Sequence, residues 1–294
     1  MASDFATSPT TTSTYDDVSY SAIITDMVLD ALMAAVVTPQ LLQYHELAGE
    51  ASKAVKIPKA DKFTAAGLTE GIEVTNTALT SDSVTITAAE VGIQATITDV
   101  LEVSDIPAAH GARLRQLGRA MADKLDVDIC ALFAGFSNSV GATGVDLSIA
   151  NILDAIFTLE NADAASLGQI VGVLHPRQAA DIRNAVDAES GQAYAGVAGA
   201  RAAQLGPAPG PGFFGAWFGI PFWMSTNVPT ANAGDDRAGG IFVADYALGL
   251  VNKWAARVES MRWPPIRGIV LTASSMYGVG EIEDLAGVAV VTDA

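Results

Sequence analysis

The sequence predicts an α+β fold, because strand-like segments occupy its first and last thirds and helical segments lie between them. Hydrophobic residues in the segment 84–103 recur with a period of two, which gives an extended arm one apolar face and one Thr-rich face. After Pro107 the period changes to three or four residues, the spacing of one stripe on a long helix. Short strand-like runs return after Gly240, so the sheet is expected to join distant parts of the chain.

The composition limits the classes of protein that fit. The chain has 294 residues, 50% of them hydrophobic and 17% charged, which is enough for one large domain or two ordinary ones. Its 33 acidic residues outnumber 16 basic ones, giving a formal net charge of −17. Because proteins that grip nucleic acid rely on Lys and Arg to neutralise phosphates, tight direct binding to DNA or RNA is not expected. A single cysteine, Cys130, excludes an internal disulfide framework and any multi-cysteine metal site.

The N-terminal part is expected to begin as a flexible arm over residues 1–20, which are rich in Ser, Thr, Asp and Tyr. A helix is expected next, ended by Thr38-Pro39. Asp26 and Asp30 lie on its polar face, and its apolar face consists of Ile23, Ile24, Met27, Val28 and Ala31. The run 31–37 is too short to span a bilayer, and no secretory signal is visible.

An extended, solvent-facing loop is expected over residues 51–63, where Pro58 argues against a continuous helix. This loop carries four of the chain's lysines at intervals of three residues: Lys53, Lys56, Lys59 and Lys62. The lysines form either a positive strip that lies on an acidic neighbour or a solvated loop, and the sequence leaves both interpretations open.

The long helix is the second main feature. Its apolar stripe consists of Leu114, Leu117, Met121, Leu125, Ile129 and Leu132. A helix of about 28 residues would be roughly 40 Å long. A rod of that length beside a β-arm is typical of a subunit that must reach across its neighbours.

The central part mixes helices and one buried strand. Ser148 is a plausible N-cap for the next helix, residues 170–174 form a fully apolar strand-like run, and His175-Pro176 opens another helix. A long Gly-, Ala- and Pro-rich loop covers 190–221 and overlaps an aromatic cluster. The remaining predicted strands are 240–244, 248–251, 256–261, 268–273, 275–279 and 287–292.

No catalytic, cofactor-binding or metal-binding residue is predicted. The glycines of a G-x-G-x-x-G pattern, Gly210, Gly212 and Gly215, lack the preceding strand and following helix that a phosphate site needs. The three histidines, His45, His110 and His175, are isolated in sequence and form no metal-binding pair at helical spacing. A helix cap or a buried polar contact is the favoured role of His175.

Two acidic groups and the aromatic cluster remain as candidates. Glu281, Glu283 and Asp284 are interpreted as a solvated turn in preference to an acid–base or cation site, and Asp235-Asp236 in the same way. The aromatic residues, among them Phe213, Phe214 and Trp217, are expected to form core or subunit interface more readily than a ligand pocket.

The order of these parts resembles a tailed-bacteriophage major capsid protein of the Hong Kong 97-like fold. Three phrases resemble wording common in phage coat proteins: residues 173–180 (VLHPRQAA), 219–222 (GIPF) and 240–249 (GIFVADYALG). The resemblance covers nearly the whole chain, although each phrase alone is a weak structural signature.

The resemblance implies a division of the chain. The five expected parts are an N-terminal arm and helix (1–48), an extended loop (49–90), a peripheral domain with the spine helix (91–145), an axial domain (146–262) and C-terminal strands that return to the sheets (263–294). Assembly contacts are expected at Lys53, Lys56, Lys59, Lys62, Phe213, Phe214 and Trp217.

The function that the resemblance implies is self-assembly into hexamers and pentamers of an icosahedral phage head, without enzymatic activity or cofactor. The expected partners are other copies of the chain, scaffolding and portal proteins, and weakly contacted double-stranded DNA, with no membrane. Assembly would take place in the host cytoplasm, and the mature location would be the virion. Scaffolding would be a separate protein or an already removed segment.

Three alternative functions remain open. They are an encapsulin-like nanocompartment shell, a hydrolase that uses the aromatic-lined loop with His175, and a surface-layer or tail-tube protein.

Overall fold

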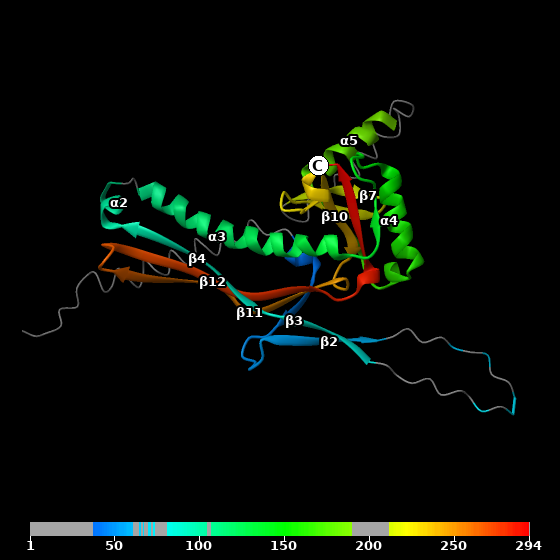
Figure 1. Cartoon of the computed structure of the whole chain (residues 1–294), viewed down its shortest axis with the longest axis horizontal. Helices are drawn as coiled ribbons and strands as arrows, with labels where there is room; N and C mark the ends of the chain where they lie inside the picture. Colours follow the sequence, from blue (N-terminus) through cyan, green and yellow to red (C-terminus); the bar gives the residue numbers. More distant parts are fainter. Residues whose placement is uncertain are drawn as a thin grey trace, which may run out of the picture.

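The computed structural model describes residues 38–60, 65, 67, 70–71, 73, 81–104, 107–189 and 212–293. These residues form an elongated molecule in which a long sheet and helix extend from one side of a mixed block (Figure 1). The predicted helix at 23–31 and most of the predicted loop at 190–221 lie outside the described residues.

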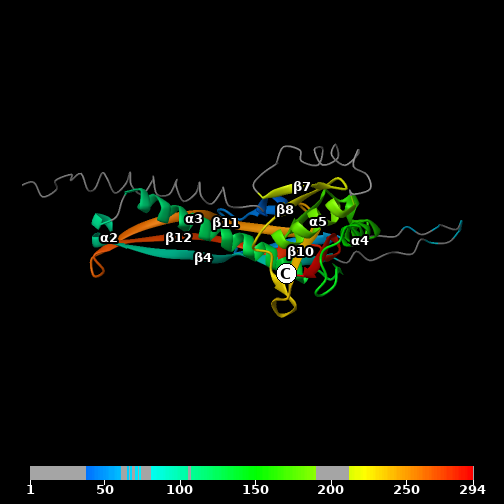
Figure 2. The same cartoon turned by 90° about the horizontal axis from the view of Figure 1, so that it is seen from above.

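The extended part is a four-stranded sheet of order β1-β11-β12-β4. Its strands are β1 (Gln43–Glu46), β4 (Ala89–Thr98), β11 (Leu248–Trp263) and β12 (Gly268–Glu281). The helix α3 (Pro107–Cys130) runs along the sheet (Figure 2). Leu117 of α3 packs on Leu271 of β12, which confirms that the predicted stripe faces the sheet. With 24 residues, α3 is about 36 Å long.

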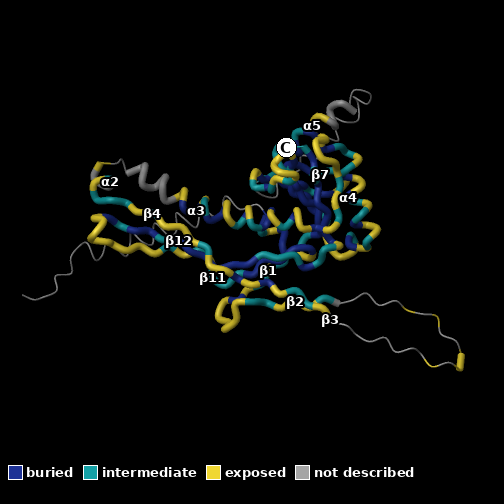
Figure 3. The backbone as a smooth tube through the Cα atoms, viewed as in Figure 1, coloured by how far each residue is buried: buried dark blue, intermediate teal, exposed yellow. Residues whose placement is uncertain are grey.

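The mixed block contains a sheet of order β5-β13-β10-β6-β8-β7, with the short strand β9 (Thr230–Ala231) paired to β10. The strands of the main path are β5 (Ser139–Val140), β6 (Ile170–Leu174), β7 (Phe213–Trp217), β8 (Ile220–Met224), β10 (Asp236–Val243) and β13 (Gly287–Asp293). The helices α4 (Ile149–Asn161) and α5 (Pro176–Glu189) belong to the same block. Its core contains Phe133, Ile152, Leu174, Phe222 and Phe242, all of which are essentially inaccessible. Figure 3 shows buried stretches of the chain gathered inside this block.

A separate two-stranded ribbon, β2 (Ala54–Ala60) with β3 (Ser81–Thr87), lies against one side of the long sheet. Ile57 and Ile86 of the ribbon pack on Val251 and Ile282. Gly280 faces Ile86, and a Cβ at Gly280 would lie 2.9 Å from that side chain. A glycine at this position therefore allows the ribbon to approach the sheet closely.

Several predicted elements are confirmed. Ser148 caps α4, and its hydroxyl oxygen accepts a hydrogen bond from the Asn151 amide at 3.3 Å. The strand β6 is buried over four of its five residues. The helix α5 begins at Pro176, as the sequence predicts.

Other expectations need correction. Leu101 and Val103 belong to a short helix, α2 (Asp99–Ser104), because the strand period continues by coincidence past the end of β4. The lysine segment is a β-strand as far as residue 60, and Pro58 is tolerated because a two-stranded ribbon has open edges. The four separate strands predicted between 248 and 279 are two long ones, since β11 carries register shifts around Trp254 that interrupt its hydrophobic pattern.

Candidate assembly surfaces

The ribbon β2–β3 is anchored to the body by an ion pair. Nζ of Lys59 lies 3.3 Å from Oε2 of Glu283, and both side chains are about one quarter exposed. Lys53 and Lys56 are exposed, and Lys62 lies outside the described residues. The four predicted lysines therefore differ in their setting, because Lys59 is engaged within its own chain.

The acidic turn beside this anchor is partly buried. Burial raises the pKa of Glu281, and the nearby carboxylate of Asp284 adds to the rise. Burial also opposes ionisation of Asp284, but hydrogen bonds from Ser137 outweigh it and lower the pKa of Asp284. The amide of Ser137 donates to Oδ1 of Asp284 at 2.8 Å. The turn is thus a docking point for the 131–137 connection as well as for Lys59.

Replacing Glu281 with Gln is expected to stabilise the protein at pH 7.5. The folded-state pKa of Glu281 lies above its ordinary value of 4.5, so its contribution to stability is present below that value and is lost as pH rises through the folded-state pKa. A neutral amide at this position does not ionise, so the stability that Glu281 loses at high pH is kept. We therefore expect the melting temperature to rise by about 2 °C at pH 7.5 and to stay unchanged at pH 4. Thermal unfolding of Glu281→Gln and the control Glu283→Gln checks this. Equal gains in both variants would contradict it, since Glu283→Gln breaks the pair with Lys59.

The other acidic pair is a solvated turn only in part. Asp235 is exposed, as expected, but Asp236 is fully buried, and its Oδ1 accepts a hydrogen bond from the Gly144 amide at 2.9 Å. Hydrogen bonds from the Asn232 side chain and the Gly144 amide lower the pKa of Asp236. This carboxylate fastens the 141–145 turn to β10, a structural task that its sequence setting did not reveal.

The aromatic cluster is mainly core. Phe214 and Trp217 meet edge to face with ring centroids 4.5 Å apart, and Trp217 lies 5.5 Å from the buried ring of Phe222. Phe213 contacts Trp223 at 5.9 Å. The predicted residues Phe213, Phe214 and Trp217 are therefore brought together on β7, at the edge of the sheet, and they support that edge from within.

The exposed aromatic residue of this region is Phe218, at the tip of the β7–β8 hairpin. Phe218 has φ of 54° and Gly219 has φ of 80°, so both residues of the two-residue turn are left-handed, as in a type I′ turn. Asn and Gly are the residues that such turns favour, and a bulky side chain there carries strain of about 1–3 kcal/mol. The side chain is 58% exposed, so packing within the chain does little to offset the strain.

The helix α4 presents a second apolar surface. Leu153 and Phe157, one turn apart, point away from the core and are 45% and 65% exposed, whereas Ile152, Ala155 and Leu159 are buried. The helix packs on β13 and β5, at the opposite edge of the sheet from the β7–β8 hairpin. The two apolar surfaces of the block therefore lie at opposite edges of its sheet.

A third exposed surface lies at the far end of the long sheet. Its large apolar residues are Val100, Met261, Trp263 and Ile266. The guanidinium of Arg262 holds the carboxylate of Asp99 through two hydrogen bonds of 3.1 and 2.9 Å. This pair connects α2 to the end of β11 and fixes the shape of the tip.

The junction between α3 and the mixed block is held by Asp126, which sequence reasoning did not single out. Its carboxylate is buried and accepts hydrogen bonds from the hydroxyls of Thr38 at 2.6 Å and Ser225 at 2.5 Å, and from the Asn227 amide at 3.1 Å. Cys130, one turn along, is buried, and burial raises the pKa of its thiol far above the ordinary range. The one available signal was an acid close to the apolar stripe of α3.

His175 and Gln178 form a structural pair at the start of α5. Nδ1 of His175 accepts a hydrogen bond from the Arg177 amide at 3.2 Å, and Oε1 of Gln178 accepts one from the His175 amide at 3.0 Å. The buried Gln178 side chain also donates to Val290 and Thr292 of β13. This is the cap that the sequence predicts for His175.

Within the described ranges, no group of three or more His, Cys, Asp or Glu side chains is arranged to hold a metal ion. None of the helices in the described part of the chain combines the length and hydropathy needed to cross a membrane.

Comparison with known proteins identifies the fold. A solved structure of Mycobacterium phage Che8 superimposes with a TM-score of 0.66 at 20% identity, over 87% of this chain and 90% of that one. The mature capsid of bacteriophage PhiM1 gives 0.62 at 15% identity, over 87% of each chain. A virus-like particle from Pyrococcus furiosus gives 0.57 at 11% identity, over 92% of this chain and 99% of that one. The chain therefore has the Hong Kong 97-like fold that the resemblance implied.

No family model matches the chain, and no curated protein matches it.

Proposed function

We propose that this protein is a major capsid protein that assembles into hexamers and pentamers and closes into an icosahedral phage head around DNA. The observation that carries the proposal is the elongated architecture itself. A β-ribbon, a long sheet and a helix extend from one block, and the two phage structures described above each match 87% of this chain. Such extensions bury little surface within one chain, so neighbouring copies are needed to cover them.

The mixed block supports a ring-like contact between copies. The apolar surfaces of α4 and of the β7–β8 hairpin lie at opposite edges of one sheet, so they cannot contact each other within a chain. A neighbour in a head-to-tail arrangement brings one surface onto the other, and such heterologous contacts close into rings. The charges at the two edges are complementary. At one edge, α4 carries Asp154 and Glu160 and no basic residue. The guanidinium of Arg183 lies beside the other edge, 4.3 Å from the ring of Phe214. We propose that Phe218 of one subunit contacts Leu153 and Phe157 of the next.

Replacing Phe218 with Asn is expected to separate stability from assembly. Asn accepts the left-handed conformation, so the isolated subunit should gain about 1 kcal/mol and melt about 2 °C higher. Particle yield should fall several-fold, because the apolar contact is lost. Differential scanning fluorimetry of unassembled subunits and negative-stain counting of particles check the two parts. A Phe218→Tyr variant keeps the ring and should assemble normally; normal assembly of Phe218→Asn would contradict the role of Phe218.

The finer assignments are also proposals. The ribbon with exposed Lys53 and Lys56 would lie on a neighbour, which the strongly acidic remainder of the chain favours. The net charge of −17 supports an inner wall that contacts packaged double-stranded DNA only weakly. Scaffolding and portal proteins would be the further partners, the role would be structural and not enzymatic, and assembly would occur in the host cytoplasm before the protein becomes part of the virion.

Electron microscopy of the purified protein, expressed alone and with a scaffolding protein from its own genome, tests the proposal. Closed icosahedral particles that form or become uniform with scaffold are the expected result. Small uniform shells that co-purify with a cargo protein would favour the nanocompartment alternative, and sheets or open tubes would favour a surface layer or tail tube. A stable species below about 200 kDa under all conditions would overturn the proposal.

A further inference from the structure

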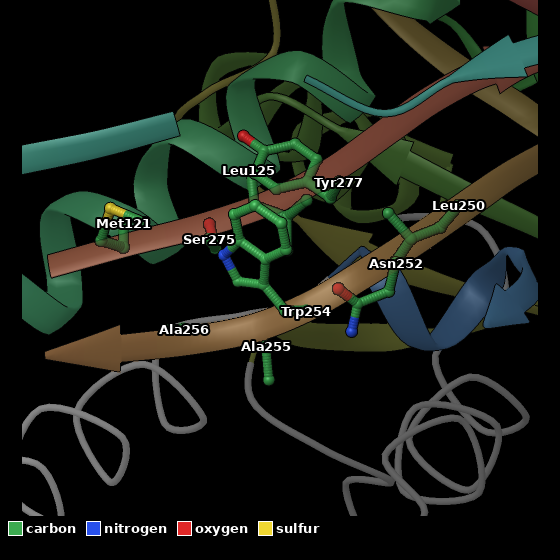
Figure 4. A pocket seen from close by; sticks show the side chains of 9 residues that line it. All are labelled: Met121, Leu125, Leu250, Asn252, Trp254, Ala255, Ala256, Ser275 and Tyr277. Carbon is green, nitrogen blue, oxygen red and sulfur yellow. The ribbon is translucent and has the colours of Figure 1, made fainter. Parts of the chain in front are cut away.

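An apolar cavity of about 140 Å³, partly open to the surface, lies between the long sheet and α3 (Figure 4). It lies where β11 loses its regular pairing with β12, on either side of Trp254. Met121 and Leu125 of α3 line the cavity together with Leu250 and Tyr277 of the sheet. A cavity of this size with an apolar lining has room for a benzene-sized group, and hence for one or two aliphatic side chains.

The cavity also contains an unmet hydrogen-bond donor. The indole nitrogen of Trp254 is buried and has no acceptor among the described residues. A buried N–H that lacks a partner costs about 1–3 kcal/mol. The arrangement therefore favours an occupant that brings both apolar side chains and an oxygen acceptor.

The chain itself supplies a segment close to this position. Thr38, the first described residue, is fully buried, and its hydroxyl donates to Asp126 at 2.6 Å. Asp126 follows Leu125, a wall residue of the cavity, directly in the sequence. The described part of the chain therefore begins close to the cavity.

We infer that the cavity is the docking site of the chain's own segment 23–31, with Met27 and its apolar neighbours entering beside Trp254. The seven Cα–Cα steps from Ala31 to Thr38 span at most about 24 Å when extended, which keeps the segment near the cavity. A tether this short gives an effective concentration in the millimolar range, so a modest apolar contact suffices. Asp26 and Asp30 on the opposite face remain in water.

The inference concerns contacts within one chain and holds whether or not shells form. The test is cross-linking with a short bis-maleimide in the full-length protein, carrying Met27→Cys together with Ala256→Cys on the cavity wall. The native Cys130 is fully buried and serves as an unreactive background. The matched control carries Asp26→Cys with Ala256→Cys, which places the thiol about 100° around a helix from position 27, on its polar side.

The expected result is an intrachain product, of monomer mass, at a yield several-fold higher for the Met27 pair than for the Asp26 pair. Equal yields or no product would overturn the inference, and so would a product of dimer mass, which would show that a neighbour's segment fills the cavity. A second readout requires no cysteine. Hydrogen exchange of residues 23–31 should speed up in Met27→Asp and stay unchanged in Thr25→Asp, and equal exchange in the two variants would also overturn it.

Discussion

Replacing Phe157 with Asp is expected to abolish particle formation while the subunit stays folded. Phe157 is 65% exposed, so a carboxylate there costs the isolated chain little. In the proposed ring contact the same carboxylate would be buried against the apolar hairpin tip of a neighbour, which costs several kcal/mol unless it is paired. Because the contact recurs around every ring, we expect the particle yield to fall at least about 100-fold, the factor that corresponds to 2.7 kcal/mol per contact.

The measurement is size-exclusion chromatography followed by electron microscopy, with circular dichroism to verify the fold. The matched control is Asn151→Asp, which adds the same charge to the first turn of α4, where a negative charge is favoured. It should assemble normally. Normal assembly of Phe157→Asp would remove α4 from the contact, and failure of both variants would point to a general charge effect on assembly.

Replacing Asp126 with Ala is expected to destabilise the folded chain by about 3 kcal/mol or more. The substitution leaves the hydroxyls of Thr38 and Ser225 and the amide of Asn227 without their shared acceptor in a buried place. Thr38 begins the described chain, and Ser225 and Asn227 belong to the mixed block, so the carboxylate on the spine helix unites three parts of the chain. Chemical unfolding of the isolated subunit gives the free energy of unfolding.

Asp123→Ala provides the control, because Asp123 is exposed on the same helix. Its free energy of unfolding should change by less than about 0.5 kcal/mol. Asp126→Asn, which keeps one acceptor oxygen, should fall between wild type and Asp126→Ala. If Asp126→Ala were as stable as Asp123→Ala, the junction would not depend on this carboxylate.

Local patterns predicted much of the fold. The stripe of α3, the cap at Ser148 and the buried strand β6 depend on neighbours within one or two turns, so periodicity and capping rules locate them. The resemblance added the arrangement of the parts, which periodicity alone does not supply. The end of β4 was misplaced, because Leu101 and Val103 continue a period of two through residues that are helical.

The candidate surfaces depended on pairing between distant segments, which the sequence pattern does not record. Lys59 was grouped with three other lysines, but its partner Glu283 lies on a turn more than 200 residues away. Asp126 and Asp236 are buried because distant segments surround them. Apart from the place of Asp126 close to the apolar stripe of α3, the sequence gives no sign of that enclosure. Phe218 was not singled out from the aromatic residues around it, because its left-handed backbone appears only in the structure.

The strand order of the long sheet has a consequence for synthesis on the ribosome. The early strand β1 pairs in parallel with β11, so Gln43 meets Gly249, and β4 pairs with β12. Neither early strand has its partner until most of the polypeptide has been translated, and contacts so distant in sequence slow folding. Until then, the edges of both strands stay open to other nascent chains. Cells that make the protein in quantity therefore have reason to hold it on a chaperone until its last fifty residues emerge.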